Sequence, residues 1–377
     1  MRSTIAILGA GAMGSAFATP ASCHGYDVRL WGTHLDTAIV ALLREGRVHP
    51  RTEEHIPGNI CVFGHEQLAD ALAGADLVAC AIASEGVQAV IGAAAPLLRA
   101  PRAILLMSKG FAFDPEGRVE LLTDTVTRLL GAQGVTSPVV AVGGPCKANE
   151  VAAARPTATV YAAADLDLAV RLADELSTED YRIEADDDPI GLEIAAALKN
   201  VFAIALGICD GLADRNRQPW HDLKAAVFAE SVAEIARVIE LVGGRPSTAV
   251  GLAGTGDLEV TGLSGRNRVY GELIGRGATP RDAFEQMRSQ ELTVEGHAAA
   301  GFSRQLVEER GGTSFWELVP LLELLTRSLE VGLFGEAVER ALADAVLPGP
   351  KGARPGHLAA GPRGHREQPE DASPPGA

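Results

Sequence analysis

The residues best suited to chemistry in this sequence are Lys199 and Asn200, which lie inside the apolar run from Ile190 to Leu206. The run has apolar residues on every face of a helix, so it predicts a buried helix. Burial of an ammonium group is costly unless an anion compensates it, and the same loss of water lowers the pKa of a lysine toward the range in which it accepts a proton. Lys199 is therefore a candidate general base. A lysine that reaches the surface from a core helix would give the same pattern.

A glycine-rich turn near the start of the sequence predicts a dinucleotide site. The β-rich residues 4–8 lead into Gly9-Ala10-Gly11-Ala12-Met13-Gly14 and then into a helical segment. In this fingerprint the first glycine permits a tight turn, the second lets the backbone approach a pyrophosphate, and the third lets the helix pack on the strand. The second predicted strand, residues 26–31, leads to Thr33 with no acid at its tip. This position leaves both NAD and NADP open as the cofactor.

Three further clusters combine glycine with polar or charged side chains. Ser108-Lys109-Gly110 and Gly143-Gly144-Pro145-Cys146 follow predicted strands, which places them at the carboxyl edge where doubly wound sheets bind ligands. Lys109 can meet an anion there, or it can be a solvated loop lysine. The third cluster, residues 251–268, contains Asp257 between glycine-rich turns and the pair Arg266-Asn267. Because arginine binds phosphate with two hydrogen bonds, we expect a substrate loop, with a surface turn and helix cap as the alternative.

The sequence predicts two domains that position these clusters. Apolar runs of strand length alternate with helical stretches and predict a parallel sheet covered by helices on both faces. The runs are residues 76–83, 103–107, 139–142, 157–161 and 181–185. From residue 190 onward the pattern is helical, most clearly over residues 221–242. The sequence therefore predicts an α/β doubly wound domain over residues 1–188, an all-helical domain over 189–347, and a disordered tail rich in Pro and Gly over 348–377.

Composition excludes several classes of function. The 377 residues carry a formal net charge of -16, which argues against general binding to nucleic acid or to an anionic membrane. The five cysteines are scattered without metal-ligand spacing, so we expect no metal site and a reducing, cytoplasmic location. Glycines interrupt the apolar start, and no stretch of about 20 apolar residues follows it. We therefore expect a soluble protein without integral membrane association.

Seven motifs follow one another along the chain to about Leu347. They are Gly9-x-Gly11-x-x-Gly14, Ser108-Lys109-Gly110, Gly144-Pro145 with Glu150, Ala197-Leu198-Lys199-Asn200-Val201, Gly254-x-Gly256-Asp257-Leu258, Gly265-Arg266-Asn267-Arg268 and Val294-Glu295-Gly296. Each motif is weak by itself, but the ordered series resembles the NAD(P)-dependent glycerol-3-phosphate dehydrogenase family. The resemblance implies a Rossmann-like amino-terminal domain, an all-helical carboxyl-terminal domain, a cleft between them, and commonly a homodimer.

The resemblance also implies roles for individual residues. Lys199 matches the proton acceptor, with Lys109 and Asp257 as its catalytic partners. The residues implied to contact the substrate are Lys109, Gly144, Cys146, Lys199, Asp257, Gly265, Arg266 and Asn267. Those implied to contact the dinucleotide are Gly9, Gly11, Ala12, Met13, Gly14, Thr33, Lys109, Ala148, Arg266 and Glu295.

The sequence departs from the family pattern at several of these positions. Ala12-Met13 replaces the Ser and aromatic residue found in many members, which removes a hydroxyl but keeps the backbone donors. Cys146 stands where Ser, Thr or Asn is usual, and Lys147 replaces an apolar neighbour and adds a positive charge. Gly265 stands where Ser often contacts phosphate. We expect the chemistry to be retained, with an altered affinity or substrate range.

The activity implied by the resemblance is the interconversion of sn-glycerol 3-phosphate and dihydroxyacetone phosphate by hydride transfer with NAD(P)(H), with NADPH slightly favoured. This reaction supplies glycerol phosphate for phospholipid synthesis. In this hypothesis Lys199 exchanges a proton with the O2 atom of the substrate while Asp257 orients the lysine. Two other functions fit the same architecture. They are a reductase of another small oxoacid and an NAD(P)H-binding sensor that has lost turnover.

Overall fold

A mixed β-sheet organises the amino-terminal half of the protein, as seen in a computed structural model that describes residues 3–290, 292–332 and 334–348. Within these residues eight strands form the sheet in the order β10-β9-β8-β5-β4-β1-β2-β3. The strands are β1 (Thr4–Leu8), β2 (Asp27–Trp31), β3 (Cys61–Phe63), β4 (Leu77–Cys80), β5 (Ala103–Leu106), β8 (Val139–Gly143), β9 (Thr157–Ala162) and β10 (Tyr181–Asp186). The predicted tail beyond residue 348 lies outside the described residues.

Each central strand is apolar throughout because both faces of the sheet are covered. In β1, Ile5 and Ile7 pack into one core, whereas Ala6 and Leu8 pack into a second core on the opposite face. The helices of this half are α1 (Ala12–Cys23), α2 (Thr37–Arg44), α3 (Leu68–Leu72), α4 (Ser84–Ala94), α5 (Leu122–Gly131), α6 (Ala148–Ala152) and α7 (Leu166–Leu176). This arrangement confirms the predicted α/β doubly wound, Rossmann-like fold.

The predicted parallel sheet contains one antiparallel pair of strands. β9 runs antiparallel to β8, and β10 then pairs with β9 in parallel. A parallel return needs a crossover of a dozen or more residues that spans the length of the sheet. The connection from β8 to β9, residues 144–156, is long enough for such a crossover, but it contains only the five-residue helix α6 and turns back at the carboxyl edge. The sequence analysis also missed three short strands, β3 and the hairpin of β6 (Phe111–Phe113) with β7 (Val119–Leu121).

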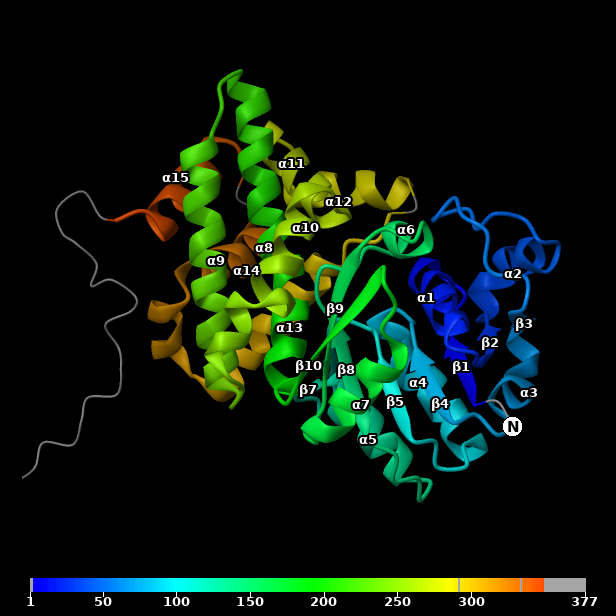
Figure 1. The fold of residues 1–377 in the computed structure, drawn as a ribbon. Coiled ribbons are helices and arrows are strands. Elements are labelled where there is room, and N and C mark those ends of the chain that lie inside the picture. Colours follow the sequence, from blue (N-terminus) through cyan, green and yellow to red (C-terminus); the bar gives the residue numbers. More distant parts are fainter. Residues whose placement is uncertain (1–2, 291, 333, 349–377) are drawn as a thin grey trace, which may run out of the picture.

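The described residues after β10 form helices and no strand, as predicted (Figure 1). These helices are α8 (Pro189–Asn216), α9 (His221–Leu241), α10 (Asp257–Leu263), α11 (Arg266–Arg276), α12 (Pro280–Ser289), α13 (Glu295–Arg310), α14 (Pro320–Val331) and α15 (Glu336–Val346). α8 begins at Pro189 because the Asp188 carboxylate caps it, accepting a hydrogen bond from Gly191 N at 2.9 Å. α8 is long and apolar enough to cross a membrane, but its most apolar window is entirely buried inside the protein.

Glycines let α11 approach the central helix α8 at backbone distance. Gly211 of α8 faces Gly275 of α11, and Gly207 of α8 lies against the backbone of Arg268. A Cβ atom added to Gly271 would lie 2.0 Å from the carbonyl oxygen of Ile204 in α8. This close packing fixes the start of α11, and with it Arg266, against the helix that carries Lys199.

The predicted substrate loop over residues 251–268 is wrong in its secondary structure. The segment forms a π-helical turn, η5 (Leu252–Gly256), then α10 and the start of α11. Its glycines signalled a loop, but Gly254 serves close packing, since a Cβ there would lie 2.0 Å from the carbonyl oxygen of Ala249. Asp257 and Arg266 are therefore the first residues of α10 and α11.

Candidate active site

The ammonium group of Lys199 is buried, and it is paired with a carboxylate. Lys199 lies in the middle of α8 and is 6% exposed. Its Nζ atom donates hydrogen bonds to Asp257 Oδ1 and, at 3.1 Å, to Thr261 Oγ1. α10 supplies both partners, since Asp257 and Thr261 are four residues apart on one face of that helix. Lys199 therefore does not reach the surface, which excludes the alternative of a lysine that extends from a core helix into solvent.

A second lysine reaches the same carboxylate from the other domain. Lys109 follows β5, and its Nζ atom donates to Asp257 Oδ2 at 2.6 Å. The same Nζ atom lies 3.5 Å from the carbonyl oxygen of Gly144, which follows β8. Asp257 is 1% exposed, so one buried carboxylate joins an ammonium group from each half of the protein.

Burial and the neighbouring charges set the protonation of this cluster. Burial lowers the pKa of Lys199 to about 8; the charge of Lys109 acts in the same direction, and Asp257 opposes them. Burial also works against the charged form of Lys109, but Asp257 outweighs it and raises the pKa of Lys109. For Asp257 burial favours the neutral acid, yet the two lysines hold its pKa below the usual value. At neutral pH the cluster thus has a permanent ion pair, and its one group that titrates near neutral pH is Lys199.

The start of α11 holds the predicted phosphate-binding residues. Arg266 donates to Glu295 Oε1 at 3.0 Å and to the hydroxyl of Thr293. The neighbouring Asn267 is buried and donates from Nδ2 to Asn200 Oδ1 at 2.9 Å. Asn200 follows Lys199 directly, so this amide pair sets the start of α11 beside the buried lysine.

The glycine turn has the shape that a dinucleotide requires. Gly9 has φ +110°, and Gly14 is so close to Gly9 that a Cβ atom would lie 2.0 Å from the Gly9 carbonyl oxygen. Gly11 differs, because nothing lies within 4 Å of its Cβ position, and it is the N-cap of α1 without a side-chain cap. The open backbone at Gly11, Ala12 and Met13 thus fits a pyrophosphate at the helix amino terminus.

The remaining predicted cofactor residues lie around this turn. Thr33 follows β2, and its hydroxyl donates to Asp36 Oδ2 at 2.8 Å. The carboxylate of Asp36 also accepts from the Thr33 backbone N–H at 2.9 Å, so this acid caps its own turn. Ala148 begins α6, where it packs with Met13 against one core of the α/β domain.

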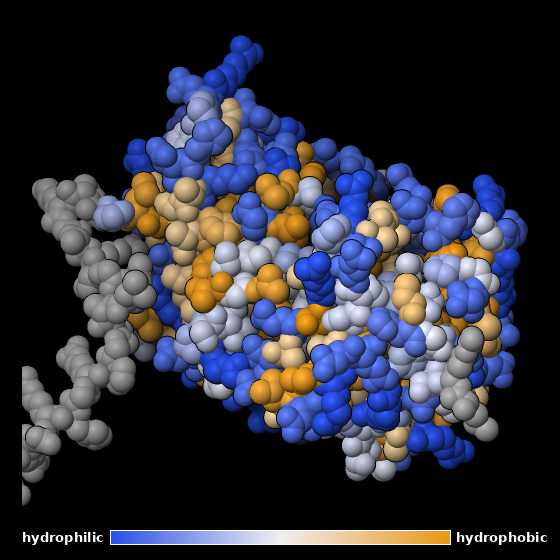
Figure 2. All heavy atoms as spheres, in the orientation of Figure 1, coloured by the Kyte–Doolittle hydropathy of each residue, from blue (hydrophilic) through white to orange (hydrophobic). Residues whose placement is uncertain are grey.

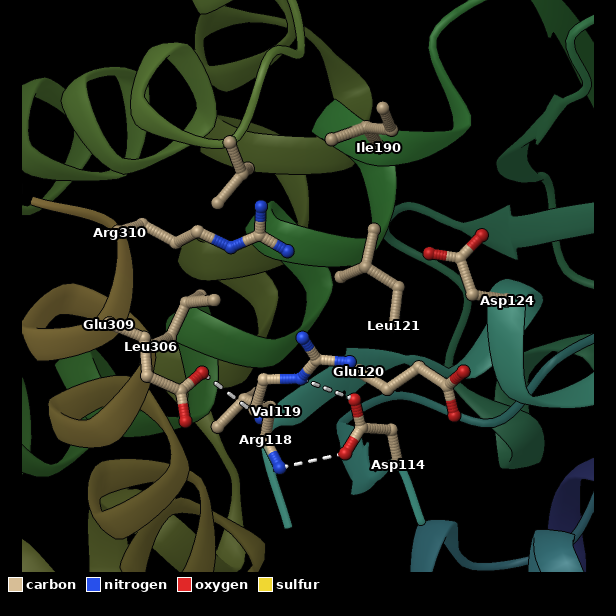
Figure 3. A pocket seen from close by; sticks show the side chains of 11 residues that line it. Asp114, Arg118, Val119, Glu120, Leu121, Asp124, Ile190, Leu306, Glu309 and Arg310 are labelled. Atoms are coloured by element: carbon tan, nitrogen blue, oxygen red, sulfur yellow. Dashed lines mark hydrogen bonds and ion pairs between the residues drawn. The ribbon is translucent and has the colours of Figure 1, made fainter. Parts of the chain in front are cut away.

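A small hollow lies next to the lysine cluster and contains predicted residues from both domains. It is lined by Ser84, Lys109, Gly110, Phe111, Asn200, Glu295, Ala298, Ala299 and Phe302. A larger cavity lies elsewhere between the β6–β7 hairpin, α5 and α13 (Figure 3). Arg118 there binds Asp114 at 2.8 Å, and none of the predicted site residues lines the cavity. Of these two spaces, the smaller hollow is the one that predicted site residues line, namely Lys109 and Glu295.

Comparison with known families agrees with this geometry. The model for the NAD-dependent glycerol-3-phosphate dehydrogenase N-terminus matches residues 4–169, and the model for the C-terminus of the same family matches residues 188–332. The chain belongs to the NAD-dependent glycerol-3-phosphate dehydrogenase family.

Individual dehydrogenases of this family resemble the chain over nearly their whole length. The NADP(+)-dependent glycerol-3-phosphate dehydrogenase of Archaeoglobus fulgidus is 35% identical over 90% of this chain and 98% of its own. The glycerol-3-phosphate dehydrogenase [NAD(P)+] of Symbiobacterium thermophilum is 36% identical over 90% of this chain and 93% of its own. The crystal structure of the glycerol-3-phosphate dehydrogenase from Coxiella burnetii superposes with a TM-score of 0.76 at 28% identity, over 91% of this chain and 98% of its own.

One polar contact of this dehydrogenase site was missed in the sequence analysis. Thr261 accepts a hydrogen bond from Lys199 and donates one from Oγ1 to the Asp257 carbonyl oxygen at 2.6 Å. The available signal was its spacing of four residues from Asp257, which becomes informative only once α10 is known to be a helix.

Two departures from the family pattern change the chemistry at the site. Burial raises the pKa of the Cys146 thiol to about 12, so this side chain is a neutral group beside the lysines and no nucleophile. Gly265 is the N-cap of α11 and has no side chain to cap the helix. The backbone N–H groups that begin α11 therefore have no side-chain cap from this position.

Proposed function

We propose that this chain interconverts sn-glycerol 3-phosphate and dihydroxyacetone phosphate by hydride transfer with NAD(P)(H). The observation that supports it most is the buried cluster in which Asp257 binds both Lys199 and Lys109. This cluster lies at the carboxyl edge of β5 and β8, beside the amide pair that leads to Arg266. A small substrate in which one hydroxyl or carbonyl group reacts and one phosphate is bound matches a buried proton donor together with a guanidinium group.

Lys199 is the acid and base of the proposed reaction. When bound, the nicotinamide ring supplies or accepts the hydride. As the hydride leaves C2 of the alcohol, neutral Lys199 takes the hydroxyl proton, and in the reverse direction its ammonium form gives a proton to the developing alkoxide. A pKa of about 8 lets Lys199 hold either form near neutral pH.

Asp257 and Lys109 position and balance that lysine. The two oxygens of Asp257 hold the two ammonium groups in fixed places, and the carboxylate stabilises the ammonium form of Lys199. Lys109 stays charged and can polarise the same substrate oxygen or hold the carbon chain of the substrate. Arg266 and Asn267 anchor the phosphate; orientation of this kind can contribute roughly 7 to 11 kcal/mol in well-oriented reactions.

The decisive experiment follows the absorbance of NADPH and of NADH on addition of dihydroxyacetone phosphate. We expect turnover with at least one of the two cofactors. Lys199→Ala should lower kcat by about 100-fold or more because the general acid is lost. Arg266→Ala should mainly raise the KM for dihydroxyacetone phosphate. A small oxoacid without phosphate that outcompetes this substrate, or tight NADPH binding without any turnover, would contradict the proposal.

We further propose a homodimer located in the cytoplasm, with NADPH as the preferred cofactor. The dimer is supported by apolar surface on the helical half, part of which is visible in Figure 2. Exposed apolar side chains of this half are Val250, Leu263, Val269, Leu318 and Phe334. Light scattering during gel filtration would give the mass, and a monomer at micromolar concentration would contradict the dimer. Comparison of kcat/KM for NADPH and NADH tests the cofactor preference, and fractionation of cells tests the location.

A further inference from the structure

Lys147 connects the two halves of the protein at the site. It is the residue before α6 in the α/β domain, and its Nζ atom donates to Ser264 Oγ at 2.6 Å. Ser264 ends α10 in the helical domain and lies two residues before Arg266. An ammonium group is thus held at the turn that leads into the proposed phosphate anchor, by a residue that belongs to the other domain.

The charge of Lys147 is not compensated by a carboxylate. The sequence contains five lysines, and four of them lie in the described part of the chain. Lys109 and Lys199 both pair with Asp257, and Lys224 pairs with Asp210 at 2.7 Å. Lys147 forms no ion pair among the described residues, and its hydrogen bond goes to a neutral hydroxyl. In a chain with a net charge of -16, such a group is a natural partner for an anionic ligand.

Without Lys147 the proposed phosphate anchor has little net positive charge. Arg266 is the arginine that begins α11, and Glu295 already offsets its charge at 3.0 Å. Gly265 contributes no side chain to the helix start. A phosphate monoester carries close to two negative charges at neutral pH and accepts several charge-assisted hydrogen bonds. Arg266 and the neutral amide of Asn267 therefore leave part of that negative charge uncompensated.

We propose that Lys147 is a further substrate-binding residue that donates to the phosphate group of the substrate beside Arg266. Ser264 holds the ammonium group at this place in the free protein. The inference rests on the proposed function, because it concerns the same substrate. The position of Ser264 favours the substrate phosphate over the cofactor pyrophosphate, whose predicted cradle is the turn at Gly11.

The test is Lys147→Met, measured with dihydroxyacetone phosphate and NADPH. Loss of one charge-assisted hydrogen bond should raise the KM for dihydroxyacetone phosphate about tenfold. We expect kcat and the KM for NADPH to stay close to those of the unchanged protein. Lys147→Arg should restore most of the affinity because it keeps the charge. Arg155→Met is the matched control, since it removes an exposed positive charge shortly after α6 and should leave every constant unchanged.

Two comparisons distinguish a Lys147 that binds the substrate phosphate from a Lys147 that only links the two domains. With dihydroxyacetone, which has no phosphate, Lys147→Met should have the same kcat/KM as the unchanged protein. Ser264→Ala keeps the ammonium group and should raise the KM for dihydroxyacetone phosphate less than Lys147→Met does. An unchanged KM for dihydroxyacetone phosphate in Lys147→Met, or equal losses with both substrates, would overturn the inference. An increase confined to the KM for NADPH would do so too. Absence of turnover in the unchanged protein would instead contradict the proposed function.

Discussion

Lys199 and Asp257 lie 58 residues apart in the sequence and share a buried hydrogen bond between α8 and α10. The second oxygen of the carboxylate is occupied by an ammonium group from the α/β domain, so Asp257 cannot turn away from Lys199 without losing an ion pair. This arrangement holds the candidate acid and base in one place. It also makes the protonation of Lys199 depend on two neighbours that mutation can remove.

The first prediction concerns pH. Because Lys199 has a pKa of about 8, its ammonium form predominates below that pH and its neutral form above it. For reduction of dihydroxyacetone phosphate, which needs the ammonium form, kcat/KM should fall as the pH rises through about 8. For oxidation of glycerol 3-phosphate it should rise over the same interval. The measurement is kcat/KM in both directions from about pH 6 to about pH 10.

A variant of the neighbouring lysine provides the control for this pH profile. Lys109→Met removes a positive charge that lowers the pKa of Lys199. Although the overall rate should fall, the midpoint of both profiles should move to higher pH. If the midpoints stay where they are in the unchanged protein, Lys199 is not the group that titrates.

The second prediction concerns the shared carboxylate. Asp257→Asn leaves two buried amines without their anion, so Lys199 loses the charge that stabilises its ammonium form. We expect kcat for reduction to fall by about 100-fold or more, as for the loss of a preorganised electrostatic partner. Thr261→Val is the control, since it removes a neutral hydroxyl from the same lysine and should cost about tenfold or less. Similar losses in the two variants would argue against an electrostatic role for Asp257.

Local patterns in the sequence predicted the parts of the site that depend on a single element. The apolar strand before Lys109 predicts its place at the carboxyl edge, and the apolar residues around Lys199 predict a buried helix. Their meeting at Asp257 depends on how α10 packs against α8, which no local pattern specifies. From the sequence, it is the resemblance to a family that predicts one site containing Lys109, Lys199 and Asp257; the local patterns do not.

The features that the sequence did not predict also depend on how elements pack together. The pattern of residues 251–268 predicts a loop because glycine usually marks a turn, whereas Gly254 allows close packing against the carbonyl oxygen of Ala249. The sequence does not predict the role of Thr261, because a threonine is uninformative until the helix face on which it lies is known. The antiparallel β9 has an ordinary strand sequence, and its direction is set by the connection through α6, which turns back at the carboxyl edge.

The third prediction tests the packing of α11 on α8. In Gly271→Ala the new methyl group would lie 2.0 Å from the Ile204 carbonyl oxygen, so the helices must separate. We expect a loss of about 1 to 3 kcal/mol in the free energy of unfolding, with a lower melting temperature. Gly301→Ala is the matched control in α13, because nothing lies within 4 Å of its Cβ position. That variant should gain up to about 1 kcal/mol through helix propensity. Equal effects of the two substitutions would show that helix propensity, and not close packing, explains Gly271.

The fourth prediction concerns a buried acid that joins the two domains away from the lysines. Glu193 of α8 accepts hydrogen bonds from the hydroxyl and, at 3.1 Å, from the backbone N–H of Thr123 at the start of α5. Burial raises the pKa of Glu193 from 4.5 to about 7, helped by the charge of Asp124. A raised folded-state pKa gives stability that is fully present below pH 4.5 and is lost as the pH rises through about 7.

Glu193→Gln should therefore flatten the fall in stability with pH over this window. The contribution of Glu193 to the free energy of unfolding is on the order of 3 kcal/mol, because each unit of pKa shift corresponds to about 1.4 kcal/mol. Melting temperatures measured from about pH 4.5 to about pH 8 would show the difference. Glu234→Gln is the comparison: Glu234 of α9 accepts hydrogen bonds from the first residues of α14, and burial raises its pKa from 4.5 to about 8. Its contribution is lost from pH 4.5 up to about 8, so only this variant should also flatten the fall between about pH 7 and about pH 8. Two results together would contradict a protonated Glu193 in the folded state. The melting temperature of the unchanged protein would rise across this window, and that of Glu193→Gln would rise by the same amount.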